Sequence, residues 1–480
     1  MKKFMRTLCL ATAVCLLASV VACGGGGEDI KMITENSEYK KVERTSPKTV
    51  HKIWTTATGG EDSMLIGGFW GPFAKDPNAN GSDVSDGIES PNFVTDHYFG
   101  LLKEAGINLL FATGAYWGWD GVSETLDLCE KYDMGNMILD GTIYSWTSQE
   151  KANGITAERL ASQLKPFIDH PACSGIYVFD EPFIPHYAAI GEVSELFYAS
   201  RPGQLIANTV AGYQGFGARH SGYDYYDEII KYIEDTHARY VCADIYNWGD
   251  VAAATDYLSI LSDTYRATKA KNIPLMVMMQ AGGHFSDVSD AERTDYYPTE
   301  GQFMWNYNLA LAYGAKGILF FPMFQPSNYA QSGGDFKTSG LFGADGSINQ
   351  WYYYAKKANT YTRFIEKILM NATCEGVMMS GNLTKAELEK KTDREKTEVL
   401  DSYRELKSVS GEALVGCFDY EGAPAYYVVN YSTETKNDVT LRFTDNYGYD
   451  VYQRATLASV HGTTMKLTLA PGEGALVVLR

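Results

Sequence analysis

The sequence predicts a (β/α)8 barrel followed by a small antiparallel β-sandwich. Two observations carry this prediction. Short apolar runs of strand type alternate with amphipathic stretches between residues 59 and 372, and the alternation reaches eight strands. From about Cys374 the pattern changes to short alternating runs separated by turn residues, which is typical of an antiparallel sheet.

The eight barrel strands are predicted from runs bounded by turn residues. They are Met64–Gly68, Asn108–Ala112, Asn136–Leu139, Gly175–Phe179, Leu205–Thr209, Tyr240–Asp244, Leu275–Met279 and Gly317–Phe321. The helices are predicted where apolar residues recur at helical spacing. They include Val94–Ala105, Val122–Tyr132, Ala157–Ile168, Tyr226–Thr236, Ala254–Ala270, Gln302–Tyr313 and Gln350–Met370. An open doubly wound sheet is the alternative, but it usually carries a GxGxxG turn after its first strand, and this spacing is absent after Gly68.

The C-terminal sandwich is predicted for residues 373–480. Its strands are Ala413–Tyr420, Ala425–Tyr431, Val439–Phe443, Tyr449–Ala455, Met465–Leu469 and Gly474–Leu479. The charged stretch Lys385–Lys407 is a solvated helix or a long loop within this domain. The aromatic residues of the sandwich either line a ligand surface or pack the domain against the barrel.

The N-terminus has the pattern of a signal peptide. Lys2, Lys3 and Arg6 precede an apolar run that is too short to span a bilayer as a stable helix. The run ends in Val20-Val21-Ala22-Cys23, which resembles a bacterial lipobox and implies lipidation of Cys23; an ordinary signal peptide or a retained anchor is the alternative. We therefore expect a signal peptide over residues 1–22, a tether and lead-in over 23–58, and a lipid anchor in the bacterial cell envelope, facing the exterior or the periplasm.

Charge and cysteine content exclude several classes of partner. The formal net charge of −18, without a basic cluster, argues against nucleic acid and disfavours an anionic polysaccharide. The five cysteines after Cys23 are scattered and form no CxxC pair, so neither a disulfide scaffold nor a zinc site is expected. No two histidines share a short motif, and the sequence implies no metal and no cofactor. Nothing in it points to a particular oligomeric state.

The candidate site lies at the carboxyl ends of the barrel strands, where such barrels carry their active sites. Five of the eight tryptophans follow strand ends, which favours a surface that stacks on flat ligands such as sugar rings, although each of them is also suited to loop packing. They are Trp70, Trp117, Trp119, Trp146 and Trp248. Polar side chains at the same strand ends are candidates for contacts with sugar hydroxyls. They are Asp140, Asn208, Tyr246, Gln280 and His284.

The strongest local signal is the fourth strand, which runs directly into Asp180-Glu181-Pro182. Two acids at the end of a buried strand are costly unless they are used or paired. Cleavage of a glycosidic bond needs two carboxyl groups, one as acid and the other as nucleophile or base. The alternative is that these residues cap the helix that follows, since an acid before proline suits a helix start.

The ending Phe179-Asp180-Glu181-Pro182 resembles the Asn-Glu-Pro ending of clan A glycoside hydrolases, and looks closest to family 42 beta-galactosidase barrels and their uncharacterised bacterial lipoprotein relatives. The resemblance covers residues 60 to 372 and implies that Glu181 is the general acid/base. The chain departs from the pattern twice: Asp180 replaces the usual Asn, and the seventh strand ends in Gln280 where the clan has its nucleophilic Glu.

The second carboxylate must therefore come from another strand. Asp244 at the end of the sixth strand is the first candidate, Asp140 is the second and Asp180 itself is the third. The adjacent Asp180-Glu181 pair also resembles family 20 hexosaminidases, in which the substrate's acetamido group attacks. We expect a glycoside hydrolase that acts on an oligo- or polysaccharide outside the cytoplasm. The alternative is a non-catalytic, carbohydrate-binding surface lipoprotein with a degenerate barrel.

Overall fold

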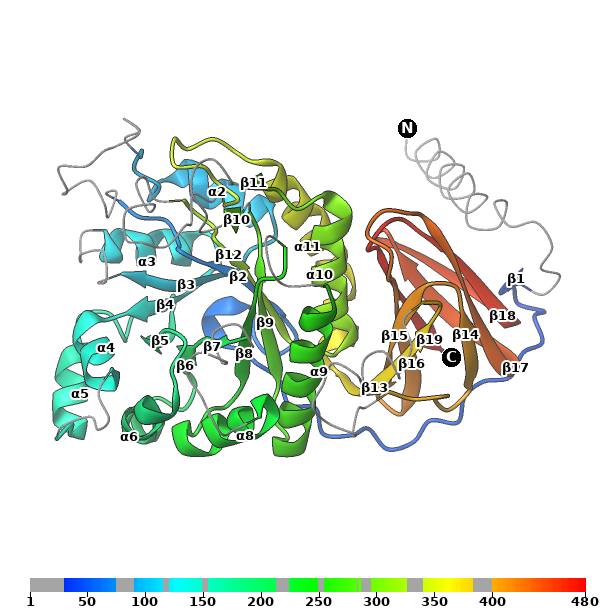
Figure 1. Cartoon of the computed structure of the whole chain (residues 1–480), viewed down its shortest axis with the longest axis horizontal. Helices are drawn as coiled ribbons and strands as arrows, with labels where there is room; N and C mark the ends of the chain where they lie inside the picture. Colours follow the sequence, from blue (N-terminus) through cyan, green and yellow to red (C-terminus); the bar gives the residue numbers. More distant parts are fainter. Residues whose placement is uncertain are drawn as a thin grey trace.

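The computed structural model describes residues 30–74, 90–114, 121–148, 154–212, 224–248, 254–282, 284–285, 295–325, 340–382 and 399–480. A barrel of parallel strands wrapped by helices lies beside a separate antiparallel sheet, as Figure 1 shows. Among the described helices, none combines the length and the apolar character needed to cross a membrane.

The barrel strands form one parallel sheet in the order β6-β5-β4-β3-β2-β12-β9-β8-β7. These strands are β2 (Leu65–Phe69), β3 (Leu109–Gly114), β4 (Gly135–Leu139), β5 (Cys173–Phe179), β6 (Leu205–Asn208), β7 (Val210–Ala211), β8 (Val241–Ile245), β9 (Leu275–Gln280) and β12 (Gly317–Phe321). The two edges of this order, β6 and β7, are separated along the chain by Thr209 alone. They correspond to the single predicted strand Leu205–Thr209, so the sheet closes on itself there. The predicted barrel is confirmed.

Helices follow the strands and cover the outside of the barrel (Figure 1). They are α2 (Asp96–Glu104), α3 (Val122–Lys131), α4 (Gly141–Thr147), α5 (Ala157–Leu164), α6 (Ile184–Ser200), α8 (Tyr225–Thr236), α9 (Ala254–Lys271), α10 (Glu300–Ala312) and α11 (Gln350–Met370). Their apolar faces share one core cluster with the outward side chains of the strands. A short hairpin, β10 (His284–Phe285) with β11 (Asp295–Tyr296), lies between β9 and α10.

The barrel interior has a second core of its own, which contains Leu65, Leu109, Met276 and Leu319. The lead-in segment closes the amino-terminal end of this interior. Ile53 is buried in the interior cluster, and the short helix η1 (Thr56–Thr58) follows it. The barrel is thus a packed core that leaves only its carboxyl end for a site.

The C-terminal domain is an antiparallel sheet whose strands enclose a separate core, as predicted. Its strands are β13 (Ala372–Ser380), β14 (Leu406–Ser410), β15 (Ala413–Tyr420), β16 (Ala423–Asn430), β17 (Asn437–Gln453), β18 (Thr456–Leu469) and β19 (Gly474–Leu479), together with β1 (Lys31–Met32) from the lead-in. The predicted runs Val439–Phe443 and Tyr449–Ala455 belong to one long strand, β17, because the chain shifts register between Arg442 and Tyr447 instead of turning.

Two further differences from the sequence concern this domain. The predicted charged helix or loop ends in a strand, since β14 begins at Leu406; residues 383–398 lie outside the described part. The lead-in also joins the sheet, because β1 pairs with β18 and the Val42 amide donates to the Arg480 carbonyl at 2.7 Å. Backbone hydrogen bonds to distant strands explain both differences, and they leave no local pattern in the sequence.

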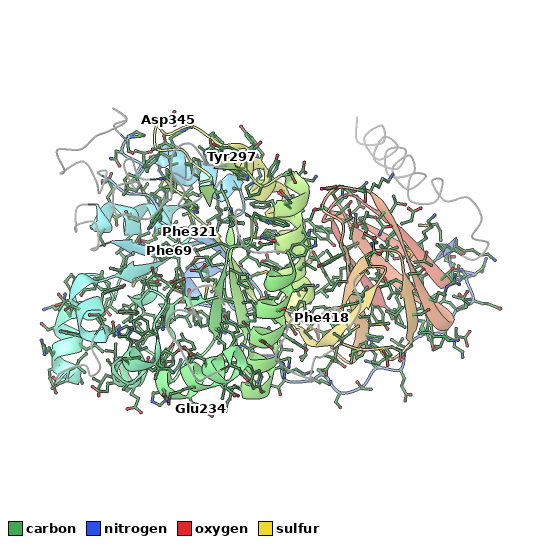
Figure 2. All side chains as sticks on the ribbon, viewed as in Figure 1. Phe69, Glu234, Tyr297, Phe321, Asp345 and Phe418 are labelled. Carbon is green, nitrogen blue, oxygen red and sulfur yellow. The ribbon has the colours of Figure 1, made fainter. Side chains whose placement is uncertain are left out.

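The sheet packs against the barrel through α10, which contacts β15 and β16. Gly416 is required at this contact, because a Cβ atom there would lie 2.1 Å from the Ala312 carbonyl oxygen. Phe418 lies where the two domains meet (Figure 2), and it is buried with Tyr427 in the cluster that includes the barrel helices. Tyr426 and Tyr449 instead fill the core of the sheet. These four aromatic residues therefore serve packing.

Candidate active site

The acidic residues of the fourth strand leave the barrel through an irregular backbone. The pairing of β5 with β6 shifts register between Tyr177 and Phe179, a bulge that redirects the residues after it. Glu181 then adopts a left-handed conformation with φ of 44°. Such a conformation costs a non-glycine residue about 1–2 kcal/mol. Strain of this kind concentrates at functional sites, and here it sets the direction of the Glu181 side chain, which is half-buried.

Asp180 is held by two hydroxyl groups. Its Oδ1 accepts hydrogen bonds from the Tyr177 hydroxyl at 2.6 Å and from the Thr209 hydroxyl at 2.9 Å. The same Thr209 oxygen accepts a bond from the Glu181 amide at 3.3 Å. Thr209 is fully buried at the point where β6 passes into β7. One threonine therefore fixes both acids of the strand ending.

Asp244 enters the same site from β8. Asp244 is 8% exposed, and its Oδ1 has no hydrogen-bond partner among the described residues. Burial raises the pKa of Asp244 well above its usual range, and the charges of Glu181 and Asp180 raise it further, while a hydrogen bond from Tyr246 opposes the shift. An effect of one charge on the pKa of another requires proximity. The structure thus brings Asp180, Glu181 and Asp244 together from two strands.

Aromatic rings form the layer beside these acids. Tyr246 stacks on Phe321 at 5.1 Å, and Trp70 lies 4.9 Å from Phe321. Phe69 joins them at 5.8 Å from Phe321, and Figure 2 shows these two rings within the barrel. Trp70 is 6% exposed and, like Glu181, has a left-handed backbone, with φ of 55°. The rings fill the carboxyl end of the interior, so the acids rest on an apolar layer.

Gln280 and Trp248 form a structural pair at the neighbouring strand ends. Gln280 Oε1 accepts from the Trp248 amide at 3.0 Å, and its Nε2 donates to the Gly282 carbonyl at 3.1 Å. Trp248 packs edge-on against Trp305 with centroids 5.6 Å apart. Asn208 is 4% exposed, and its Nδ2 has no hydrogen-bond partner in the described part of the chain. The Trp248 Nε1 atom likewise has no hydrogen-bond partner among the described residues, so Asn208 and Trp248 each keep an unused donor.

Asp140 and Trp146 have structural roles. Asp140 caps α4: its Oδ1 accepts from the amides of Thr142 and Ile143, and its Oδ2 accepts from the Gln163 side chain at 2.8 Å. A carboxylate so occupied offers no free oxygen to a substrate. Trp146 is buried on α4 with the Arg159 guanidinium 4.7 Å from its ring centre. Its neighbours belong to the outer core of the barrel.

Three candidates lie outside what the structure describes. Trp117 and Trp119 are outside the described residues, and His284 is placed only as a backbone position in β10. In the described ranges, no group of three His, Cys, Asp or Glu side chains is arranged to hold a metal ion. The sequence analysis missed Tyr177 and Thr209. A tyrosine three residues before Asp180 in an otherwise apolar strand is the signal that marks the first of them.

No protein-family model and no curated protein matches the sequence. The structure does match solved structures. A beta-galactosidase from Bacillus circulans sp. alkalophilus has a TM-score of 0.58 at 8% identity, over 87% of this chain and 99% of that chain. Gan42B, a GH42 beta-galactosidase from G. stearothermophilus, has a TM-score of 0.58 at 10% identity, over 90% of this chain and all of that one.

The chain has the fold of a GH42 beta-galactosidase. This agrees with the resemblance seen in the strand ending Phe179-Asp180-Glu181-Pro182. At this low identity the likeness concerns the fold, and the chemistry depends on the side chains of this chain.

The role assigned to Thr209 gives a test of positioning. We expect Thr209→Val to lower kcat about tenfold or more with a smaller effect on KM, because valine keeps the shape but frees Asp180 and Glu181. Loss of these two part-buried hydrogen bonds should also lower the free energy of unfolding by about 1–3 kcal/mol. Steady-state kinetics and urea denaturation measure the two effects. Thr209→Ser keeps the hydroxyl and should restore kcat; a serine variant as slow as the valine variant would contradict the positioning role.

Proposed function

We propose that this protein is a glycoside hydrolase in which Glu181 and Asp244 are the two carboxyl groups that cleave the bond. The observation that carries the proposal is the electrostatic interaction between Glu181, which follows β5, and Asp244, which lies in β8, at the carboxyl end of the barrel. Two carboxyl groups on either side of a glycosidic bond are the usual requirement for its hydrolysis.

The environments of the two residues separate their roles. Asp244 is buried and its pKa is raised, which favours its protonated form in the free protein. It is then suited to protonate the glycosidic oxygen as the bond from that oxygen to the anomeric carbon breaks. Glu181 is less buried and is suited to act as the anion, which attacks the anomeric carbon or removes a proton from water. This exchanges the roles inferred from the resemblance, because the deeper carboxyl group keeps the proton.

The rest of the site supports a neutral sugar as substrate. The rings of Tyr246 and Phe321, which are stacked, and the ring of Trp70, which is tilted against Phe321, provide an apolar surface next to the acids. The three acids and a net charge of −18 repel anionic glycans. A sugar ring presents flat C–H faces together with neutral hydroxyl groups, which fits both features.

A panel of chromogenic glycosides tests the proposal. We would incubate the purified protein with p-nitrophenyl beta-galactoside, glucoside, mannoside, xyloside and the two N-acetylhexosaminides, together with neutral polysaccharides, and measure released sugar. Release that requires Glu181 supports the proposal. No release from any member of the panel, together with retained sugar binding, would support the carbohydrate-binding alternative instead.

One observation favours a second candidate, hydrolysis assisted by the substrate's acetamido group. Gln280 stands where a nucleophilic Glu is expected and its amide is occupied, whereas Asp180 is held firmly beside Glu181. A fixed Asp180 would orient the acetamido group while Glu181 supplied the proton. Cleavage of the N-acetylhexosaminides alone would select this candidate, and cleavage of glycosides without an acetamido group would exclude it.

We also propose that Cys23 carries a lipid that anchors the protein in a bacterial envelope. The support is the sequence Val20-Val21-Ala22-Cys23 after a basic and apolar leader. Expression of the full chain in a bacterium should place it in the membrane fraction, with a mass increase on the peptide that begins at Cys23. Cys23→Ser should move the protein to the soluble fraction. Membrane association that survives this substitution would rule out the lipid as the anchor.

A further inference from the structure

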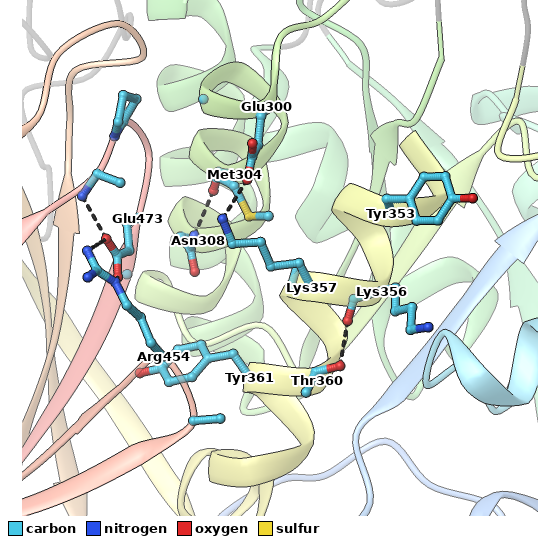
Figure 3. A pocket seen from close by; sticks show the side chains of 16 residues that line it. Glu300, Met304, Asn308, Tyr353, Lys356, Lys357, Thr360, Tyr361, Arg454 and Glu473 are labelled. Carbon is cyan, nitrogen blue, oxygen red and sulfur yellow. Dashed lines mark hydrogen bonds and ion pairs between the residues drawn. The ribbon is translucent and has the colours of Figure 1, made fainter. Parts of the chain in front are cut away.

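A cavity lies between the barrel and the C-terminal sheet, and none of the proposed active-site residues lines it. Its volume is about 730 Å³, within the range of small-molecule binding sites. Figure 3 shows its three sides: α10, α11, and the sheet residues around Arg454 and Glu473. The lining of α10 extends from Glu300 to Asn308, and that of α11 extends from Tyr353 to Tyr361.

The inner surface of the cavity is mostly apolar. Met304, Ala358 and Pro471 contribute to it, together with the ring of Tyr361. The Tyr361 hydroxyl is already used, since it donates to the Tyr452 carbonyl at 2.8 Å and accepts from the Leu476 amide at 3.1 Å. These bonds hold the ring in place as part of the wall. A ligand here gains its binding free energy chiefly from apolar contact with a rigid surface.

The polar groups of the floor are also satisfied internally. The Asn308 side chain donates to the carbonyls of Met304 and Gly472, both at 2.9 Å, and accepts from the Tyr427 hydroxyl at 2.7 Å. The floor therefore offers no unused amide or hydroxyl group. Hydrogen bonds to a ligand must come from the rim.

The rim carries two ion pairs on opposite sides. Arg454 binds Glu473 through two bonds of 2.6 and 2.7 Å, and Lys357 binds Glu300 at 2.5 Å, as Figure 3 shows. Lys356 pairs with Glu104 outside the cavity. Each lining charge thus has a partner, and a charged ligand would have to break a pair. The Arg454, Lys357 and Glu300 side chains remain 45–66% exposed, so they keep donor and acceptor positions for neutral hydroxyl groups.

The turn that holds Arg454 is strained at the cavity edge. Arg454 and Ala455 are the two central residues between the paired Gln453 and Thr456, and both have left-handed backbones, with φ of 52° and 56°. Turns of this type prefer Asn-Gly. A residue other than Asn or Gly in this left-handed conformation destabilises the turn by about 1–2 kcal/mol. The chain accepts this cost where both residues line the cavity.

We propose that this cavity binds a short neutral oligosaccharide, and this rests on the proposed function as a second contact for the same glycan. A sugar ring matches the cavity in three ways: an apolar face for the Tyr361 wall, neutral hydroxyl groups for the paired rim, and no net charge. A long glycan bound here and at the active site would be held at two places on the protein.

The test separates this cavity from the active site by blocking it. Thr360 is exposed on α11 and lines the cavity, and Thr360→Trp fills it at a position where a large side chain is compatible with the helix. Lys367→Trp on the same helix lies outside the lining and is the matched control. Both are made in a Glu181→Gln background, so that binding is measured without turnover. Calorimetric titration uses neutral tetrasaccharides of galactose, glucose, mannose or xylose.

We expect at least one tetrasaccharide to bind the Glu181→Gln protein, and Thr360→Trp to remove one binding site or weaken binding at least about tenfold. Lys367→Trp should leave binding unchanged. With Glu181 intact, Thr360→Trp should slow hydrolysis of polysaccharide several-fold and leave a chromogenic monosaccharide glycoside unaffected. Binding unchanged by Thr360→Trp, or no binding of any tetrasaccharide, would overturn the inference. Binding lost with Thr360→Trp in a protein that hydrolyses nothing would uphold it and end the proposed function alone.

Discussion

Glu181→Gln is expected to reduce hydrolysis of any substrate of this protein by roughly 10²- to 10⁴-fold, the usual contribution of a positioned acid or base. Glutamine keeps the size of the side chain and the strained backbone, but it neither attacks an anomeric carbon nor transfers a proton. Sugar binding should persist, because the aromatic layer and Asp180 are unchanged. Steady-state kinetics measure the loss, and calorimetry measures the binding.

Glu192→Gln is the matched control for this substitution. Glu192 lies exposed on α6, the helix that follows the Glu181 segment, so the same chemical change there should leave both activity and binding intact. If the Glu181 variant retained the wild-type rate, the two-carboxylate proposal would fail. If both variants lost activity together with their near-ultraviolet circular dichroism, the loss would come from folding instead.

Asp244→Asn is expected to reduce activity about as much as Glu181→Gln does, and at the same time to stabilise the protein. Asparagine cannot supply the proton that the proposal assigns to Asp244. The native carboxyl group is buried beside Glu181 and Asp180 with one unpaired oxygen, and its raised pKa means that folding at neutral pH requires proton uptake. A side chain that is always neutral removes this unfavourable step. A gain of about 1 kcal/mol at neutral pH is the scale of such relief.

The raised pKa of Asp244 determines how the free energy of unfolding changes with pH. The pKa of Asp244 is higher in the folded protein than in the unfolded chain, so the folded state binds the proton more tightly. As pH rises from the unfolded pKa, near 4, to the raised folded pKa, the unfolded chain holds fewer protons and the free energy of unfolding falls. Asp244→Asn should lack this part of the fall. Urea denaturation at a series of pH values measures the difference between the two proteins.

Asp140→Asn is the matched control for Asp244→Asn. It also tests Asp140 directly against Asp244 as the second carboxylate. Asp140 is buried as well, but its oxygens cap α4 and bind Gln163. Asparagine caps helices about as well as aspartate, so activity and stability should change little. An Asp140 variant without activity beside an active Asp244 variant would reverse the assignment.

The barrel and the place of its site followed from local patterns. The eight strand-like runs all appear in the structure. The strand Gly317–Phe321 and the long helix Gln350–Met370 have the predicted bounds, and the other strand ends differ from the prediction by at most two residues. Strand ends in a parallel barrel all point to one face, so Asp180, Glu181 and Asp244 were expected there. The tryptophans were less informative, because Trp146 and Trp248 pack into the fold with Arg159 and Trp305. The size of a side chain and its position in the sequence do not distinguish a ring that stacks on a ligand from a ring that packs inside the protein.

The sequence by itself determined the alternation of strands and helices and the strand ending at Asp180-Glu181, since periodicity and strand direction are properties of neighbouring residues. Only the tertiary structure decided that Asp244, and not Asp140, shares an electrostatic environment with Glu181. Both aspartates lie at the end of a barrel strand, and they differ in what surrounds them. Asp140 accepts hydrogen bonds from the amides of α4, whereas Asp244 is buried and is affected by the charges of Glu181 and Asp180. Such surroundings arise from contacts between distant strands, and so does the cavity between Tyr361 and Arg454.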